Sequence, residues 1–139
     1  MKIPARIRYA VRILIELGKK KREPLPLHEI EKTQRVSSKF AKQILQPLER
    51  FGLVEGRRGR GGGYCLRLEP DKITLMDIFQ AMGESMHPAP CLEAVGLCPR
   101  ENYCGARDVW ESLERILTDY FGRTTIRDLI NKEQATGPD

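Results

Sequence analysis

Apolar residues recur at intervals of three and four in the first part of the chain and predict three short helices. The first begins near Pro4 and runs to residue 17, with arginines away from its apolar face. After a basic loop, residues 27–35 are long enough for a two-turn helix. The third helix is expected to begin at Ser37, a residue type that caps helices, and to stop at Gly52. Three helices joined by short turns are typical of a helix-turn-helix domain.

Two short apolar runs follow, around a tip made of glycine and arginine. The segment is LVEGRRGRGGGYCLRL, and residues 57–63 contain only those two residue types. The flanking runs predict two strands, and glycine allows the tip to turn tightly and approach another surface closely. Arginine carries a planar fork of donors that matches a phosphate or a guanine edge. The sequence therefore predicts a mainly α fold with a small β-hairpin wing.

Beyond the wing, helical and irregular stretches alternate. Thr74 and Asp77 form a capping-box signature for a short helix, whereas residues 84–104 lose periodicity and gain Pro and Gly. The longest helical pattern is ARDVWESLERILTDYFGR, and its broad apolar stripe favours pairing with a second copy over a simple core helix. The stripe contains Val109, Trp110, Leu113, Ile116, Leu117, Tyr120 and Phe121.

These patterns divide the chain into four parts. We expect a winged helix-turn-helix DNA-binding domain over residues 1–83, a cysteine loop over 84–104, a dimerisation helix with a C-terminal helix over 105–131, and a disordered tail over 132–139. No apolar run is long enough to span a bilayer, and the N-terminus does not resemble a signal peptide. The sequence predicts a cytoplasmic homodimer without a membrane partner.

Charge is distributed unevenly along the chain and changes the interpretation of the first half. Residues 1–68 hold 17 Lys and Arg against 6 Asp and Glu, a net charge of +11. The remainder holds 7 against 13, a net charge of −6. A basic half with a helix-turn-helix pattern indicates that this half faces a polyanion, double-stranded promoter DNA.

The predicted DNA contacts come from the third helix and the wing. Free N–H groups and the positive dipole end at a helix start favour phosphate, and a Gln amide can pair with a base. The predicted residues are Ser37, Ser38, Lys39, Lys42, Gln43, Arg57, Arg58, Arg60 and Gly61. The chain has two histidines and no triad or carboxylate pair arranged for catalysis, so we do not expect an enzyme.

Three of the four cysteines, Cys91, Cys98 and Cys104, lie within one predicted loop. An odd number of thiols in a cytoplasmic protein disfavours a disulfide framework. Structural zinc, thiol redox sensing without a metal, and an iron–sulfur cluster all remain compatible with the spacing. Cys65 alternates with Tyr64 and Leu66 on the wing strand and is expected to be a small buried or half-buried residue and not a ligand.

The combined motifs resemble the Rrf-type bacterial winged-helix regulators, in particular the iron–sulfur branch that includes IscR, NsrR and RirA. The resemblance rests on RYAVRILIEL, RRGRGGGYCL, ITLMDIFQAM, the three-cysteine loop and DVWESLERIL. It implies a homodimeric transcription regulator, a repressor or an activator, whose promoter binding is controlled by a [2Fe–2S] or [4Fe–4S] cluster that senses redox state, iron or nitric oxide. The implied cluster ligands are Cys91, Cys98 and Cys104.

At three positions the sequence differs from the regulators that it resembles. Arg107 stands where the IscR pattern has a histidine ligand, and Arg8 stands where the NsrR pattern has an aspartate ligand. Lys42 replaces the glutamate that helps IscR-like proteins choose among DNA sites. The fourth ligand is therefore open among His87, Glu93, Glu101, Asp108 and a small exogenous molecule, and a thiol-sensing or zinc-bound regulator remains the alternative.

Overall fold

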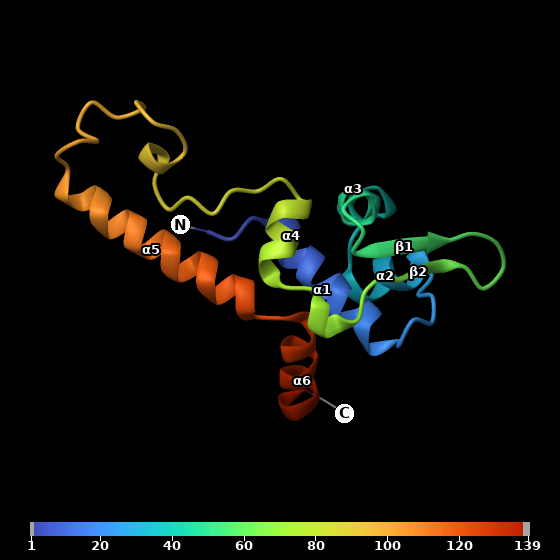
Figure 1. Ribbon diagram of the computed structural model, residues 1–139. Helices are drawn as coiled ribbons and strands as arrows, with labels where there is room; N and C mark the ends of the chain where they lie inside the picture. Colours follow the sequence, from blue (N-terminus) through green and yellow to red (C-terminus); the bar gives the residue numbers. More distant parts are fainter. Residues whose placement is uncertain (1, 138–139) are drawn as a thin grey trace.

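Helix α1 (Ala5–Lys19) lies at the centre of the folded domain, and five other elements surround it (Figure 1). The computed structural model describes residues 2–137 of the chain. Ala10, Ile13, Leu14 and Leu17 are fully buried, and they face α2, α3, α4, α6 and the strand β2. The apolar face of the first helix is thus the centre of the hydrophobic core.

Helices α2 (Leu27–Gln34) and α3 (Ser38–Arg50) form the helix-turn-helix. The turn between them places Arg35 in a left-handed conformation, with a φ of 55°. Ser37 then caps α3, because its hydroxyl oxygen accepts a hydrogen bond from the Phe40 N–H at 3.0 Å. The sequence predictions of a short second helix and of an N-cap at Ser37 are confirmed.

The wing is an antiparallel hairpin of β1 (Val54–Arg57) and β2 (Gly63–Leu66). Val54 pairs with Leu66 and Arg57 with Gly63. The loop after α1 adds an antiparallel bridge from Leu25 to Tyr64 of β2. At Gly63 the φ of 148° and the carbonyl of Leu25 leave no room for a side chain. The glycine therefore lets the loop after α1 pair closely with the wing.

A short 3-10 turn, η1 (Pro70–Lys72), leads to α4 (Leu75–Ala81), whose start is paired with the start of α6 (Ile126–Thr136). Both helices begin with a capping box, at Thr74 and Thr125, and these two threonines form a β-bridge. The capping box predicted from Thr74 and Asp77 is confirmed.

The predicted disordered tail over residues 132–139 is wrong for its first five residues. Helix α6 continues to Thr136 because the segment contains Lys, Glu, Gln and Ala, which are good helix formers. Glu133 also forms an ion pair with Lys19 of α1 at 3.1 Å. Pro138 and Asp139 lie outside the described residues.

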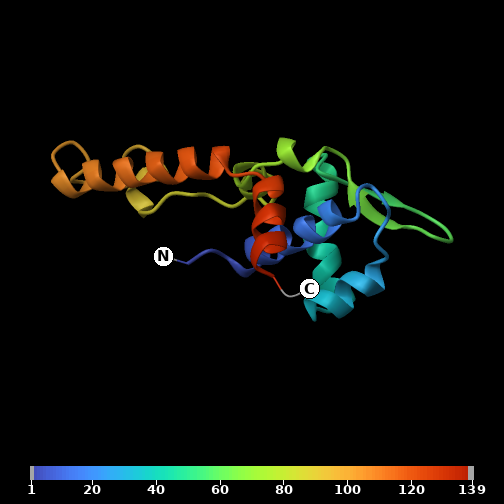
Figure 2. The ribbon, with the colours of Figure 1, turned by 90° about the horizontal axis from the view of Figure 1, so that it is seen from below.

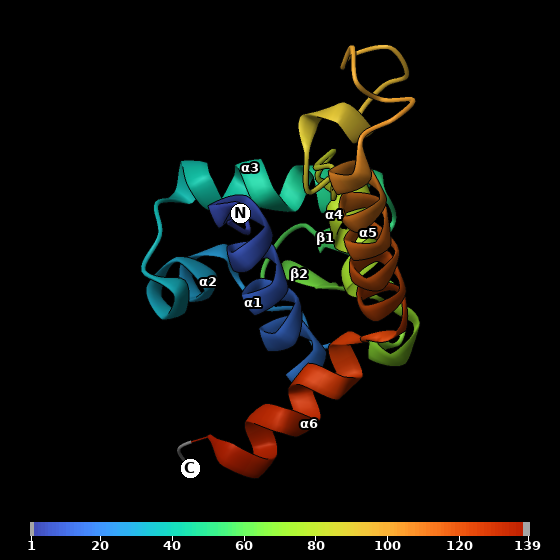
Figure 3. The same ribbon diagram turned by 90° about the vertical axis from the view of Figure 1, so that its left-hand side faces the viewer.

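Helix α5 (Gly105–Arg123) extends away from the core, and the segment that joins α4 to it runs alongside (Figure 2). This segment, residues 84–104, holds one short 3-10 turn, η2 (Pro90–Leu92). Near its C-terminal end α5 touches the core, where Phe121 stacks on Phe79 of α4 with ring centroids 5.4 Å apart. Viewed nearly along α5, the cysteine-containing loop lies at the end of the helix farthest from α6 (Figure 3).

Candidate DNA interface and cysteine loop

The exposed side of α3 carries a row of polar side chains at its N-terminal end. Burial of Ala41, Ile44 and Leu45 fixes the rotation of the helix, so that the intervening polar positions face outward. An open groove of about 480 Å³ is lined by Ser38, Lys39, Lys42, Gln43 and Gln46. The structure thus brings four predicted residues together. It adds Gln46, which follows Lys42 by one helical turn.

Ser37 has a structural function in this region. Its hydroxyl oxygen is engaged by the Phe40 N–H, and Phe40 in turn packs edge-on against Tyr9 of α1 at 5.4 Å. The cap and the aromatic pair fix the start of α3 relative to α1. The uncapped N–H groups of the first turn and the positive end of the helix dipole suit a phosphate.

The wing tip presents its arginines to solvent. Arg58 and Arg60 are exposed, and Gly59 and Gly61 turn the backbone with φ values of 89° and 77°. Arg57 is held by Glu55, with Nη2 lying 3.3 Å from the carboxylate. The hydrogen bond from Arg57, followed by one from Cys65, lowers the pKa of Glu55. The carboxylate therefore stays ionised and offsets one of the three arginine charges.

Cys65 belongs to strand β2 of the wing and is fully buried. Its thiol donates to the Glu55 carboxylate at a distance of 3.6 Å. Burial, as the largest cause, raises the pKa of the Cys65 thiol. A buried thiol with a raised pKa is a poor nucleophile and a poor metal ligand, so this cysteine is part of the core.

The other three cysteines lie at the opposite end of the molecule from the wing (Figure 1). Cys91, Cys98 and Cys104 are all half-buried on the same loop, with free thiols. Within residues 2–137, no three Cys, His, Asp or Glu side chains converge as a ligand set for a metal ion. The structure therefore places the predicted ligands on one loop without gathering their sulfur atoms.

Several charged side chains of this region are already engaged. Glu101 accepts a hydrogen bond from the Gly96 N–H at 2.6 Å, and His87 Nδ1 lies 2.8 Å from the Glu114 carboxylate of α5. Arg107 donates to the Cys91 carbonyl at 2.9 Å and to Glu111 at 3.0 Å. The hydrogen bond to Glu111, as the largest cause, raises the pKa of Arg107. Two of the predicted fourth-ligand residues thus have protein partners.

The stripe predicted on α5 divides into two faces. Leu113, Leu117 and Phe121 are half-buried, and Phe121 packs on α4. In contrast, Val109 is 58% exposed, Ile116 is 64% exposed and Tyr120 is 49% exposed. Among the described residues, α5 has no fully buried position. A long helix with this much apolar surface in water is typical of a protein–protein interface.

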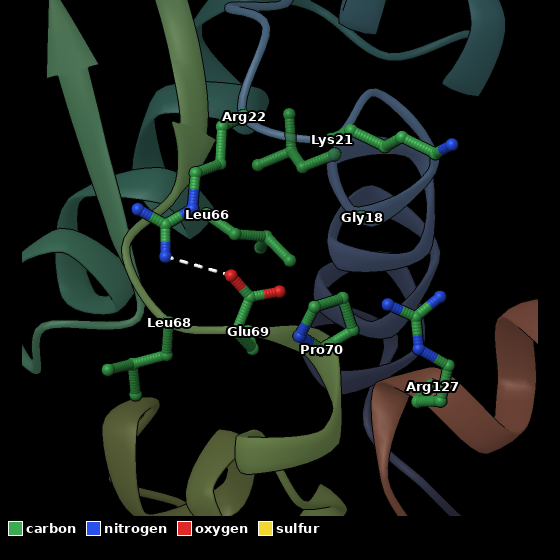
Figure 4. Close-up of a pocket in the computed structure, with 9 residues that line it drawn as sticks. Gly18, Lys21, Arg22, Leu66, Leu68, Glu69, Pro70 and Arg127 are labelled. Atoms are coloured by element: carbon green, nitrogen blue, oxygen red, sulfur yellow. Dashed lines mark hydrogen bonds and ion pairs between the residues drawn. The ribbon is translucent and has the colours of Figure 1, made fainter.

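A separate hollow of about 270 Å³ lies between the end of α1, the strand β2 and α6 (Figure 4). Arg22 reaches across it to Glu69 at 2.9 Å, and Arg127 enters from α6. The partners of this ion pair are 62% and 59% exposed, so the pair contributes little to stability. The residues predicted for DNA or metal binding do not line this hollow.

The basic helix-turn-helix and its glycine–arginine hairpin define a winged-helix DNA-binding protein. A family model described as "Rrf2: Iron-dependent Transcriptional regulator" matches residues 3–132. The chain therefore belongs to the Rrf2 family of transcriptional regulators, and it is not an enzyme.

Relatives within the family differ in name. The chain is 35% identical to the transcriptional regulator CymR of Bacillus subtilis, covering 94% of this chain and 91% of that protein. It is 28% identical to the regulator IscR of Klebsiella pneumoniae, covering 96% and 82% respectively. The solved structure of CymR, titled the global cysteine regulator of B. subtilis, superimposes with a TM-score of 0.78 at 31% identity, covering 95% of this chain and 98% of that one.

The predicted family, winged-helix fold and regulatory class are thus confirmed. Among residues 2–137, no helix is long and apolar enough to cross a membrane.

Proposed function

We propose that this chain is a homodimeric regulator that reads promoter DNA with the start of α3 and the wing. The observation that carries the proposal is the groove of Ser38, Lys39, Lys42, Gln43 and Gln46, which presents donors and cations on one exposed helix face. An α-helix fits the major groove, where a Gln amide can pair with adenine and a Lys with guanine or phosphate. The wing arginines would contact the DNA phosphate backbone or the adjacent DNA groove.

Dimerisation is supported by the exposed apolar face of α5. Two copies related by a twofold axis would bury Val109, Ile116 and Tyr120 of both chains in one interface. Two recognition helices would then meet two half-sites of a symmetric operator. A monomer could bind only one half-site, so dimerisation would raise the affinity for the operator.

For control, we propose an iron–sulfur cluster, [2Fe–2S] or [4Fe–4S], held by Cys91, Cys98 and Cys104. The donor set fits the group chemically, because such clusters are held by cysteine thiolates and these three are half-buried on one loop. Such a cluster supplies a centre whose redox change or loss alters the charge and ligation of its loop. The sulfur atoms must converge to share it, so ligation would require the loop to change conformation.

A second form of control uses the thiols without iron. It is favoured by two observations: the sulfur atoms are not gathered in the described loop, and the identity to CymR exceeds that to IscR. In that form, oxidation or modification of a loop thiol would change the loop directly. Zinc on the same thiols is the third possibility.

Anaerobic reconstitution with iron and sulfide separates these forms. The expected result is a coloured protein with stoichiometric iron and sulfide, whose absorbance is lost when Cys91, Cys98 and Cys104 are each replaced by Ser and is kept in the matched control Cys65→Ser. A colourless protein that takes up zinc or no metal under the same conditions would refute cluster control. DNA binding of the wild type at low salt tests the first proposal independently.

A further inference from the structure

Beyond Met86, which packs against the hydrophobic core, the cysteine loop is attached to the rest of the molecule mainly by polar contacts. From Gly83 to Thr125 the structure contains no buried residue, and the loop has only the short turn η2 as regular structure. A loop with so little buried apolar surface needs other interactions to oppose its conformational entropy. Two sets of polar contacts to α5 supply them: His87 lies 2.8 Å from Glu114 near the start of the loop, and a larger group of contacts is built around Arg107.

Arg107 lies in the first turn of α5, and its side chain is only 18% exposed. Its guanidinium donates from Nη1 to the Cys91 carbonyl at 2.9 Å and from Nε to Glu111 at 3.0 Å. Nη1 also lies 3.9 Å from the Glu101 carboxylate. One planar group thus contacts the loop at two places and its own helix at a third.

Glu101 extends this arrangement across the loop. The same carboxylate oxygen that faces Arg107 accepts a hydrogen bond from the Gly96 N–H at 2.6 Å. The Gly96 backbone has a φ of 85°, so the chain turns sharply at the point where Glu101 holds it. Arg107, Glu101 and Gly96 therefore connect the middle of the loop to α5, while Cys91 is held directly.

We propose that Arg107 is the positioning residue that fixes the metal-free conformation of the cysteine loop against α5. The proposal deepens the proposed function, because it rests on this loop being the sensing element. A guanidinium stays protonated and cannot donate a lone pair to iron, so Arg107 acts through the loop and not as a ligand. A rearrangement that moves the Cys91 main chain toward the other thiols must break or move the contact between Arg107 and the Cys91 carbonyl. That rearrangement would therefore act directly on the first turn of α5.

Hydrogen exchange of the metal-free, full-length protein tests this proposal. In Arg107→Ala, amides of residues 91–101 are expected to exchange about tenfold faster or more, since a partly buried charged hydrogen bond is lost. Arg107→Lys keeps the charge without the planar fork and should restore protection only in part. The matched control is Arg115→Ala on the same helix, because Arg115 bonds only to Ser112 among its described neighbours.

The localisation of the effect distinguishes positioning from a general loss of stability. Peptides from α1 and α3 should keep wild-type protection in Arg107→Ala, and Glu101→Gln should loosen the region around Gly96 in the same way. Unchanged loop exchange in Arg107→Ala, or full protection in Arg107→Lys, would overturn the proposal. Because the experiment uses metal-free protein, it is independent of the reconstitution result: the loop assignment stands or fails whether or not the wild type binds a cluster.

Discussion

Replacing Ile116 with Ala tests the dimer interface most directly, because its side chain is large, apolar and 64% exposed. Fully burying an Ile side chain is worth about 1.5–3 kcal/mol, so covering the exposed part in a dimer contributes about 1–2 kcal/mol per chain. In a twofold dimer each substitution counts twice, which gives about 2–4 kcal/mol. The dimer dissociation constant should therefore rise by about 30- to 700-fold.

Sedimentation velocity over a dilution series measures this change, and Thr118→Ala provides a matched control. Thr118 is also exposed on α5, but it lies two residues further along, about 200° around the helix from Ile116. The control should dimerise as the wild type does. A wild type that stays monomeric at high concentration, or an Ile116→Ala dimer as tight as the control, would refute the assignment of this face to self-association.

Three further predictions concern the DNA-binding domain. For Arg58→Ala, the slope of log K against log salt should shrink by about 1.8, since the dimer loses one phosphate contact per chain; fluorescence anisotropy on operator DNA measures it, and Arg123→Ala at the far end of α5 should leave it unchanged. Gly63→Ala should lower the free energy of unfolding, measured by thermal denaturation, by more than about 1 kcal/mol, because alanine is strained at this positive φ and its Cβ meets the Leu25 carbonyl. Gly105→Ala is the control and should leave the free energy of unfolding unchanged, because nothing lies within contact distance of its Cβ. Because burial raises the pKa of Cys65 above its ordinary value of 9.0, the folded protein favours the protonated thiol. The folding free energy is therefore unaffected by this group below pH 9.0, and the protein loses stability as the pH rises from 9.0 through the folded-state pKa. The urea-unfolding free energy of wild type relative to Cys65→Ala should therefore fall above this pH, and a constant difference would contradict the buried protonated thiol.

The regular elements were predictable because their apolar spacing reports directly on which face is buried. Ile7, Leu14 and Leu17 follow the helical period, and all are buried in α1. Ser37 could be assigned as a cap because a serine before an apolar helix has a specific hydrogen-bonding role, which the structure shows. Helix α6 was underestimated because its last residues are polar and lack an apolar stripe. Their helix propensity and the ion pair of Glu133 with Lys19 extend it.

The site was predictable to a smaller extent. Spacing identified three thiols on one loop, but it carries no information on where their sulfur atoms lie relative to one another. The role of Arg107 was hidden for a related reason: its partners, Cys91 and Glu101, approach it only through the folding of a loop without periodicity. Gln46 could have been found from the sequence, since it lies three and four residues after Gln43 and Lys42 and so shares their helix face.

The arrangement of α4 explains how a change in the cysteine loop could reach the DNA-reading helix. Helix α4 contacts α5 on one side, through the stacked rings of Phe79 and Phe121, and contacts α1 and α3 on the other. The cysteine loop begins directly after α4 and is attached to α5 at Arg107 and, through His87, at Glu114. A rearrangement of the loop would therefore act on both helices that meet at the aromatic stack. Because α5 also carries the proposed dimer face, a shift at the stack would change the position of each α3 relative to its twofold mate. Under the proposed regulation, the cysteine loop would therefore act on the spacing between the recognition helices and not on the chemistry of the groove itself.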